Sequence, residues 1–242
     1  MGNAAKIKKV AVLGGLLLFI AFLFIFFAPA LGFVKHHFKP LPYFGPRDVE
    51  YRTENGVEVA DTIYHTIPKF SFTDQDGNTF SSTDVEGKIL VVDFMFTTCT
   101  GWCPIMTSQM LRLDWKLEDP AFDDILFLSH TVDPETDTPE VLYKYARKNK
   151  IDTERWKLLT GDRTALYEHG VYGFFLAAKE DALAPDGFLH SNMFVLVDRE
   201  GHIRGYYDGL KTEEVNLVAS DVKMLLKEEK VKAQEALEAL EK

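Results

Sequence analysis

The feature that most constrains the fold is a strand, a turn and a helix in the middle of the chain. Residues 88–96 form a near-continuous apolar run with two valines, the pattern of a central strand covered on both faces. Residues 104–118 follow with a helical pattern and a proline in the first turn. The chain's two cysteines, Cys99 and Cys103, lie between these elements. Both sulfurs are therefore expected on one strand-to-helix turn, where the helix dipole favours a thiolate.

The patterns on either side of this passage predict the fold class. A turn at residues 76–78 joins two short strands before the central strand, and an apolar strand at 125–128 and a helix follow it. A hairpin around residues 198–201 and an amphipathic helix end the pattern. This order predicts an α/β fold with a thioredoxin-like mixed sheet flanked by helices. The domain is expected to cover residues 66–228, and residues 229–242 are expected to form a charged helical tail.

The N-terminal part of the chain predicts a membrane anchor. Residues 10–34 contain no charged side chain, and an apolar run of about 18 residues or more is typical of a transmembrane helix. Three lysines precede the run, so residues 1–34 are interpreted as a cytoplasmic stub and an anchor, with the domain on the extracytoplasmic (periplasmic or equivalent) side. A cleaved secretory signal is the alternative and would export the same domain. Residues 35–65, with three prolines and many charges, are expected to be a linker.

The charge balance excludes one class of partner. Residues 1–34 hold three of the 27 basic residues and none of the 37 acidic ones, which leaves residues 35–242 with 24 bases, 37 acids and a net charge of −13. An acidic surface repels phosphate groups, so nucleic acid and anionic lipid are not expected to bind this domain.

The spacing of the cysteines indicates chemistry at the sulfurs. Three residues separate them, where thioredoxin-type oxidoreductases have two, and residues four apart on a helical turn face the same way. Two thiolates are an incomplete zinc site, whereas copper accepts fewer ligands and binds thiolate and imidazole well. A disulfide bond between residues 99 and 103 would close a loop too small to stabilise the fold much. Thiol–disulfide exchange and copper binding with an added histidine are the two interpretations.

Seven histidines are available as that added ligand. His190 precedes the strand pattern of residues 191–197, which in a thioredoxin-like sheet neighbours the cysteine turn, so it is a candidate ligand. A strand-entry histidine is more often structural, and the residues alone leave this choice open. His130 ends a buried strand and is interpreted as a hydrogen-bonded structural residue. The others are interpreted as linker, surface, strand-end or loop residues: His36, His37, His65, His169 and His202.

Several motifs together resemble the Sco/SenC family. They are the cysteine motif at 99–104, Val-Asp-Pro-Glu-Thr-Asp-Thr-Pro at 132–139, Trp-Lys-Leu-Leu-Thr-Gly at 156–161, and His190 ahead of Phe-Val-Leu-Val-Asp at 194–198. Their order and spacing extend the resemblance from residue 67 to about residue 226. One departure is Thr100, because the family often has proline directly after the first cysteine.

The resemblance implies a function and a set of metal ligands. The family consists of exported, membrane-anchored proteins that bind copper and help to build the dinuclear copper centre of cytochrome c oxidase. It implies a copper metallochaperone in which Cys99, Cys103 and His190 hold Cu(I) or Cu(II) and Asp133 is an orienting residue near the metal. The implied partner is the copper-bearing oxidase subunit or another copper or thiol protein. Asp133 also has a purely structural interpretation, because Asp-Pro after a strand commonly begins a turn or a helix.

Other functions compete with this one. A thiol-disulfide reductase, which is an enzyme, would use Cys99 and Cys103 as catalytic residues, one to attack and one to resolve a mixed disulfide, and would not need His190. A peroxide-reducing enzyme would need an arginine beside its cysteine, and none is obviously placed. A copper- or redox-sensing module would need a transducer domain, of which the chain shows no sign.

Overall fold

A computed structural model describes residues 14–24, 27, 39–54, 56–176 and 191–240, and it divides the chain into two compact units, Met1–Lys39 and Pro40–Lys242. Residues 14–24 of the first unit are helical. Within the described ranges no helix is both long enough and apolar enough to span a bilayer. The remainder of the predicted anchor, apart from residue 27, lies outside the described residues.

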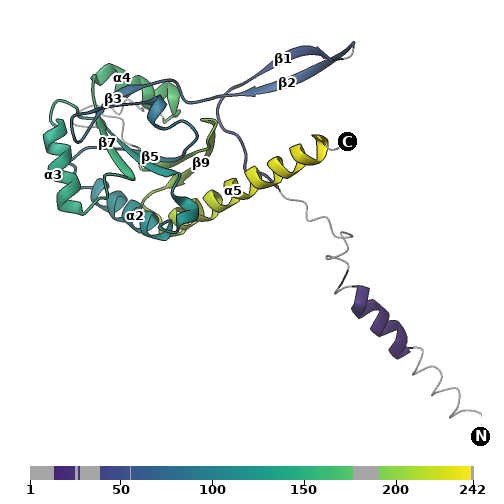
Figure 1. The fold of residues 1–242 in the computed structure, drawn as a ribbon. Helices are drawn as coiled ribbons and strands as arrows, with labels where there is room; N and C mark the ends of the chain where they lie inside the picture. Colours follow the sequence, from purple (N-terminus) through teal and green to yellow (C-terminus); the bar gives the residue numbers. More distant parts are fainter. Residues whose placement is uncertain (1–13, 25–26, 28–38, 55, 177–190, 241–242) are drawn as a thin grey trace, which may run out of the picture. The chain divides into compact units, whose positions relative to one another are not determined.

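The second unit is built on a seven-stranded mixed sheet (Figure 1). The strand order is β4-β3-β7-β6-β5-β8-β9, with β5, β6 and β7 parallel and the outer strands antiparallel to their neighbours. The strands are β3 (Ser71–Asp74), β4 (Thr79–Ser81), β5 (Ile89–Met95), β6 (Ile125–Thr131), β7 (Trp156–Thr160), β8 (Met193–Val197) and β9 (Ile203–Asp208).

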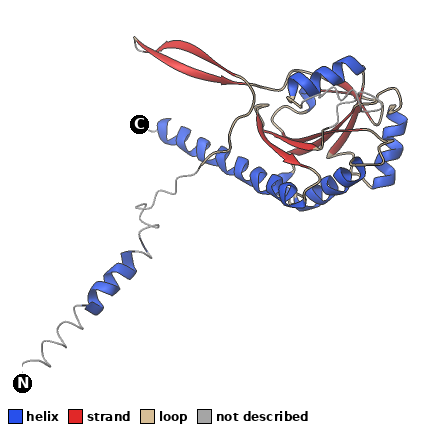
Figure 2. Ribbon diagram, turned by 180° about the vertical axis from the view of Figure 1, so that it is seen from behind, coloured by secondary structure: helices blue, strands red, loops and turns tan. Residues whose placement is uncertain are grey.

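Helices cover both faces of this sheet (Figure 2). One face carries α2 (Cys103–Lys116), α3 (Pro139–Asn149) and α5 (Thr212–Leu240). The other face carries α4 (Arg163–Glu168) and the π-helical turn η3 (His169–Gly173). The 3-10 turns are η1 (Ser82–Asp84) and η2 (Pro120–Phe122). The predicted mixed sheet flanked by helices is therefore confirmed.

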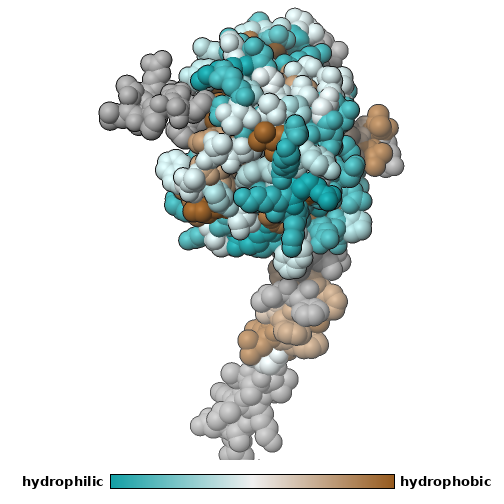
Figure 3. Space-filling model, turned by 90° about the vertical axis from the view of Figure 1, so that its left-hand side faces the viewer, coloured by the Kyte–Doolittle hydropathy of each residue, from teal (hydrophilic) through white to brown (hydrophobic). Residues whose placement is uncertain are grey.

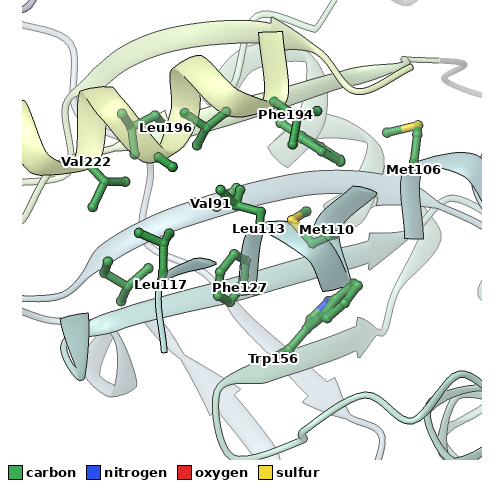
Figure 4. Packing of buried hydrophobic residues seen from close by; sticks show 14 of the residues in the cluster. Val91, Met106, Met110, Leu113, Leu117, Phe127, Trp156, Phe194, Leu196 and Val222 are labelled. Carbon is green, nitrogen blue, oxygen red and sulfur yellow. The ribbon is translucent and has the colours of Figure 1, made fainter. Parts of the chain in front are cut away.

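The core is centred on β5, in which every residue is buried. Ile89 and Val91 of β5 pack in the cluster under α2, whereas Leu90 and Val92 pack in the cluster on the opposite face. The inner face of α2 and the residue that caps its C-terminus contribute four fully buried side chains, shown in Figure 4: Met106, Met110, Leu113 and Leu117. Burying a side chain of this size stabilises the fold by roughly 1.5–3 kcal/mol. This packing fixes the start of α2 at the carboxyl end of β5.

The surface over this core is mostly polar. Figure 3 shows mainly hydrophilic side chains with small, separate hydrophobic patches on the face at the left of Figure 1.

The segment expected as a linker, 35–65, contains a β-hairpin in its described part. Strand β1 (Arg47–Glu54) pairs with β2 (Val57–Tyr64) in a separate two-stranded antiparallel sheet. The sequence signal for this hairpin is Asn-Gly at 55–56 between alternating polar and apolar residues, a typical two-residue hairpin turn.

A buried arginine attaches the residues before this hairpin to the domain. The Arg204 guanidinium on β9 donates to the carboxylates of Asp198 (2.9 Å) and Glu228 (2.7 Å) and to the carbonyl oxygen of Leu41 (2.7 Å). The three charged side chains are at most 4% exposed. Buried charges are stable only when paired, so this cluster fixes Leu41 and Pro42 against β9 and α5. Helix α5 continues beyond Glu228, its last buried residue, to Leu240.

Two histidines lie inside an aromatic cluster on the α4 face of the sheet. His130 on β6 is fully buried and stacks on Phe94 at 5.0 Å, and the His169 ring lies 5.3 Å from the His130 ring. Three more phenylalanines enclose them: Phe70, Phe72 and Phe174. Among the described residues neither ring nitrogen of His130 has a hydrogen-bond partner of good geometry, so packing rather than the expected hydrogen bonding holds this ring.

The burial of His130 and His169 predicts that the folded state loses stability in acid. Burial lowers the pKa of His130 well below its usual value, and it lowers the pKa of His169 to about 4. An unfolded chain protonates both rings near pH 6.5, so the unfolded state binds more protons below that pH. The contribution of these two histidines to stability should therefore be complete above about pH 6.5 and fall as the pH drops towards 4, by up to about 1.4 kcal/mol per pH unit for each histidine.

We expect the variant His169→Phe to flatten this acid slope. Its free energy of unfolding should change less between pH 6.5 and pH 4.5 than that of the wild type, because one suppressed protonation has been removed. Urea unfolding at a series of pH values, followed by circular dichroism, measures the difference. Parallel slopes for the two proteins would contradict the assignment.

Candidate metal and thiol site

The two cysteines lie on the turn from β5 to α2, as the sequence predicts. Cys99 is in the loop and partly exposed, whereas Cys103 is the first residue of α2 and buried. The Cys103 backbone N–H donates a hydrogen bond of 3.5 Å to the Cys99 Sγ, and the Cys99 N–H donates to the Phe96 carbonyl oxygen at 3.3 Å. Both side chains are free thiols. The turn therefore presents two sulfurs at the N-terminus of one helix.

The surroundings of the two thiols differ in their effect on pKa. Burial raises the pKa of Cys99, but hydrogen bonds from the Cys103 backbone and thiol and from the Gly101 and Trp102 backbone outweigh it, so the net shift is downward. Burial raises the pKa of Cys103 to about 12, and the nearby Cys99 and Asp93 add to the rise. Thiolate character therefore concentrates on Cys99, the more accessible sulfur.

A buried carboxylate holds the cysteine loop in place. Asp137, with no exposed surface, accepts hydrogen bonds from the backbone N–H of Thr97 (3.0 Å) and from the hydroxyl of Thr131 (2.6 Å). The hydroxyl of Thr97 also donates to it. Asp137 thus ties the loop after β5 to the end of β6. Sequence reasoning did not select it, although it lies inside the 132–139 motif.

Asp133, the residue expected near the metal, makes its described bonds through the backbone. Its N–H donates to the Thr131 hydroxyl (3.0 Å), and its carbonyl oxygen accepts from the N–H groups of Thr136 and Asp137. No hydrogen bond or ion pair joins its carboxylate to the cysteine turn within the described ranges. The adjacent Val132 N–H donates to the Met95 carbonyl, so Asp133 lies at the same edge of the sheet as the cysteines. Its role towards a metal stays a prediction.

A second buried carboxylate lies on β5. Asp93 is 2% exposed and accepts a hydrogen bond from the Ser129 hydroxyl, which in turn accepts one from the Trp156 indole N–H. Burial raises the pKa of Asp93 to about 7, and its charge contributes to the raised pKa of Cys103. Sequence reasoning missed Asp93, although an aspartate within an apolar strand is itself a signal of function or burial.

His190 lies outside the described residues. The sheet topology nevertheless relates its neighbours to the cysteines. Strand β8 runs antiparallel to β5, with Val195 opposite Val92 and Val197 opposite Leu90. The start of β8 is therefore at the end of β5 from which the cysteine turn leaves. The assignment of His190 as a ligand stays a prediction.

In the described part of the chain, one group of side chains that could together bind a metal ion lies outside the cysteine turn. Asp198, Glu200 and His202 come together at the β8–β9 turn. Asp198 already pairs with Arg204 and accepts the backbone N–H groups of Glu200 and His202. These bonds account for the cluster as a turn structure.

Comparison with known proteins identifies the family. The SCO1/SenC family model matches residues 60–227, which is more than half of the chain. The "SCO1 protein homolog" of Bacillus subtilis is 31% identical over 168 residues, covering 69% of this chain and 86% of that protein. The chain therefore belongs to the SCO1/SenC family, and the thioredoxin-like fold is confirmed.

Two further proteins are informative by their descriptions. The solved structure of BsSco, described as having a disulfide switch and as a member of the Sco family of cytochrome c oxidase assembly proteins, is 31% identical with a TM-score of 0.59. The match covers 66% of this chain and 93% of the BsSco chain. A "Putative copper-binding protein" of Stutzerimonas stutzeri is 27% identical over 141 residues, covering 58% of this chain and 68% of that protein.

The electrostatic effect of Asp93 on Cys103 gives a testable consequence. We expect Asp93→Asn to lower the pKa of Cys103, because a negative charge that opposes the thiolate is removed. The pH dependence of alkylation, resolved for each cysteine by mass spectrometry, measures this change. The exposed Asp124, replaced by Asn, is the control for the altered net charge. An unchanged Cys103 pKa in Asp93→Asn would show that the two groups do not interact.

Proposed function

We propose that the chain is a membrane-anchored copper metallochaperone that serves the assembly of the dinuclear copper centre of cytochrome c oxidase, with copper as its cargo. The observation that carries the proposal is the cysteine turn, in which the Cys103 N–H reaches the Cys99 sulfur at 3.5 Å and the pKa of Cys99 is lowered. A thiolate beside a second sulfur is a donor pair that Cu(I) prefers. The family assignment supports the same conclusion.

The proposed ligands are Cys99, Cys103 and His190. The chain enters β8 at the edge of the sheet where the cysteines lie, which supports His190 as the third ligand. Asp133, at the same edge, is proposed as an orienting group or a weak fourth ligand for Cu(II). Cys103 has a raised pKa, so metal binding must displace its proton and affinity should rise with pH.

The proposed transfer is a ligand exchange that uses the accessible sulfur. Three ligands leave room for an incoming thiolate of the acceptor, and Cys99 is the more exposed of the two thiols. Membrane anchoring is part of the proposal. The uncharged run at 10–34 and the helix at 14–24 support an anchor that holds the domain on the extracytoplasmic side.

A second function, thiol–disulfide reduction of the same acceptor, is favoured by the unequal thiols. The Cys99 thiolate would attack an acceptor disulfide, forming a mixed disulfide and releasing one acceptor thiolate. Cys103 would then lose its proton and attack the Cys99 sulfur, releasing the second acceptor thiolate. Two electrons pass to the acceptor, and the chain is left with a Cys99–Cys103 disulfide.

A copper titration separates these functions. We expect Cys99→Ser and Cys103→Ser to weaken Cu(I) binding by roughly a hundredfold or more, because hard hydroxyl oxygen replaces a soft thiolate. His190→Ala should weaken it at least about tenfold and remove one nitrogen from the X-ray absorption spectrum, while thiol exchange persists. His202→Ala, outside the cysteine turn, is the matched control. Unchanged affinity and an unchanged spectrum in His190→Ala would remove histidine from the ligand set.

A further inference from the structure

Helix α2 has an outer face that the core does not use. Its inner face is the buried row of Met106, Met110 and Leu113, which the C-cap residue Leu117 extends (Figure 4). The outer face begins beside the cysteines with Trp102 and Ile105, which are 50% and 48% exposed. Ser108 and Arg112 continue it at intervals of three and four residues, the spacing of neighbours on one side of a helix.

A shallow groove follows this outer face. It has a volume of about 500 Å³ and is lined by Pro104, Ile105, Ser108, Gln109, Arg112 and Thr212. Thr212, the first residue of α5, forms the opposite wall. The Gln109 side chain donates to its hydroxyl at 2.9 Å, and the Arg112 guanidinium donates to its carbonyl oxygen at 3.1 Å. Figure 1 shows α2 and α5 side by side at this place. The groove therefore starts at the cysteine turn and has fixed walls.

The far end of the groove carries positive charge without a carboxylate partner. Arg112 and Lys116 both donate to the neutral side-chain oxygen of Asn216. Among the described residues neither forms an ion pair, and the buried Nε–H of Arg112 has no hydrogen-bond acceptor. The rest of the domain is strongly acidic, with a net charge of −13 over residues 35–242. Two cations that share one neutral amide oxygen favour a carboxylate ligand.

We propose that this groove binds an extended segment of the acceptor protein, with an apolar side chain on Trp102 and Ile105 and a carboxylate on Arg112. The inference rests on the proposed function, because exchange with Cys99 brings the acceptor's own cysteine to the start of the groove. Cys103 and Arg112 are nine residues apart, or about 13.5 Å along the helix at 1.5 Å per residue. An extended chain covers that distance in about four residues. The acidic residue is therefore expected about four positions from the acceptor cysteine.

The test uses peptides with one activated cysteine. Each carries leucine next to the cysteine and, four positions away on one side or the other, glutamate or glutamine. The cysteine is a mixed disulfide with thiopyridine. The Cys99 thiolate attacks the peptide sulfur, the mixed disulfide forms, and thiopyridone leaves and is measured by absorbance. The full-length protein in detergent, with Cys103→Ser to retain the mixed disulfide, supplies the attacking thiol.

We expect one glutamate peptide to react about five- to tenfold faster than its glutamine counterpart at low salt. Arg112→Gln should abolish this preference, so that the glutamate and glutamine peptides react at the same rate with this variant. Lys148→Gln, an exposed cation on α3, is the matched control and should retain it. Trp102→Ala should slow both peptides. Equal rates for glutamate and glutamine in the unsubstituted groove, or an equal loss for both peptides in Arg112→Gln, would overturn the proposal.

Two further measurements separate this proposal from the one on which it rests. Copper titration of the protein with both cysteines intact tests the proposed function directly. If copper binds normally but the peptide reaction shows no glutamate preference, the groove proposal alone is overturned. If copper binding and the glutamate preference are both absent, the chaperone function is overturned as well. Sedimentation of the wild type tests a second copy as the occupant. A dimer that Trp102→Ala dissociates would reassign the groove to self-association and overturn the acceptor proposal.

Discussion

The hydrogen bonds accepted by Asp137 are the constraint on which the site depends. This carboxylate has no exposed surface, and it joins Thr97, in the loop before the cysteines, to Thr131 at the end of β6. The sulfurs themselves lie on a loop and a helix start, which are less constrained than strands. Asp137 fixes the beginning of the cysteine loop, and core packing fixes α2, where the loop ends. The fold therefore holds the two sulfurs at one place before any metal is bound.

The buried ionisable groups on the two faces of the sheet act in opposite directions. The enclosed pair His130 and His169 remains neutral in the folded state and destabilises the fold in acid. Asp93, whose pKa is raised to about 7, holds a proton that the unfolded chain releases, so it destabilises the fold as the pH rises from about 4 to 7. Their sum makes the wild-type profile flatter than either part. Differences between variants are therefore more informative than the profile of one protein.

The sequence predicts elements whose signals are local. The apolar run of β5, the cysteines and the proline of α2 are contiguous, so the strand, the turn and the helix can be inferred together. Asp137 could not be chosen over Asp133 in this way, because both occur in one motif and only the fold shows which carboxylate meets Thr97 and Thr131. The prolines and charges of residues 35–65 led to the linker interpretation, which overlooks the Asn-Gly turn signal of the hairpin at 47–64.

The Arg204 cluster determines where the folded domain begins along the chain. Leu41 and Pro42 are bonded to Arg204 on β9, and Glu228 of α5 also bonds both Arg204 and Leu41. The ordered body of the domain therefore begins at these residues rather than at β3, and whatever tether precedes the domain must end before Leu41.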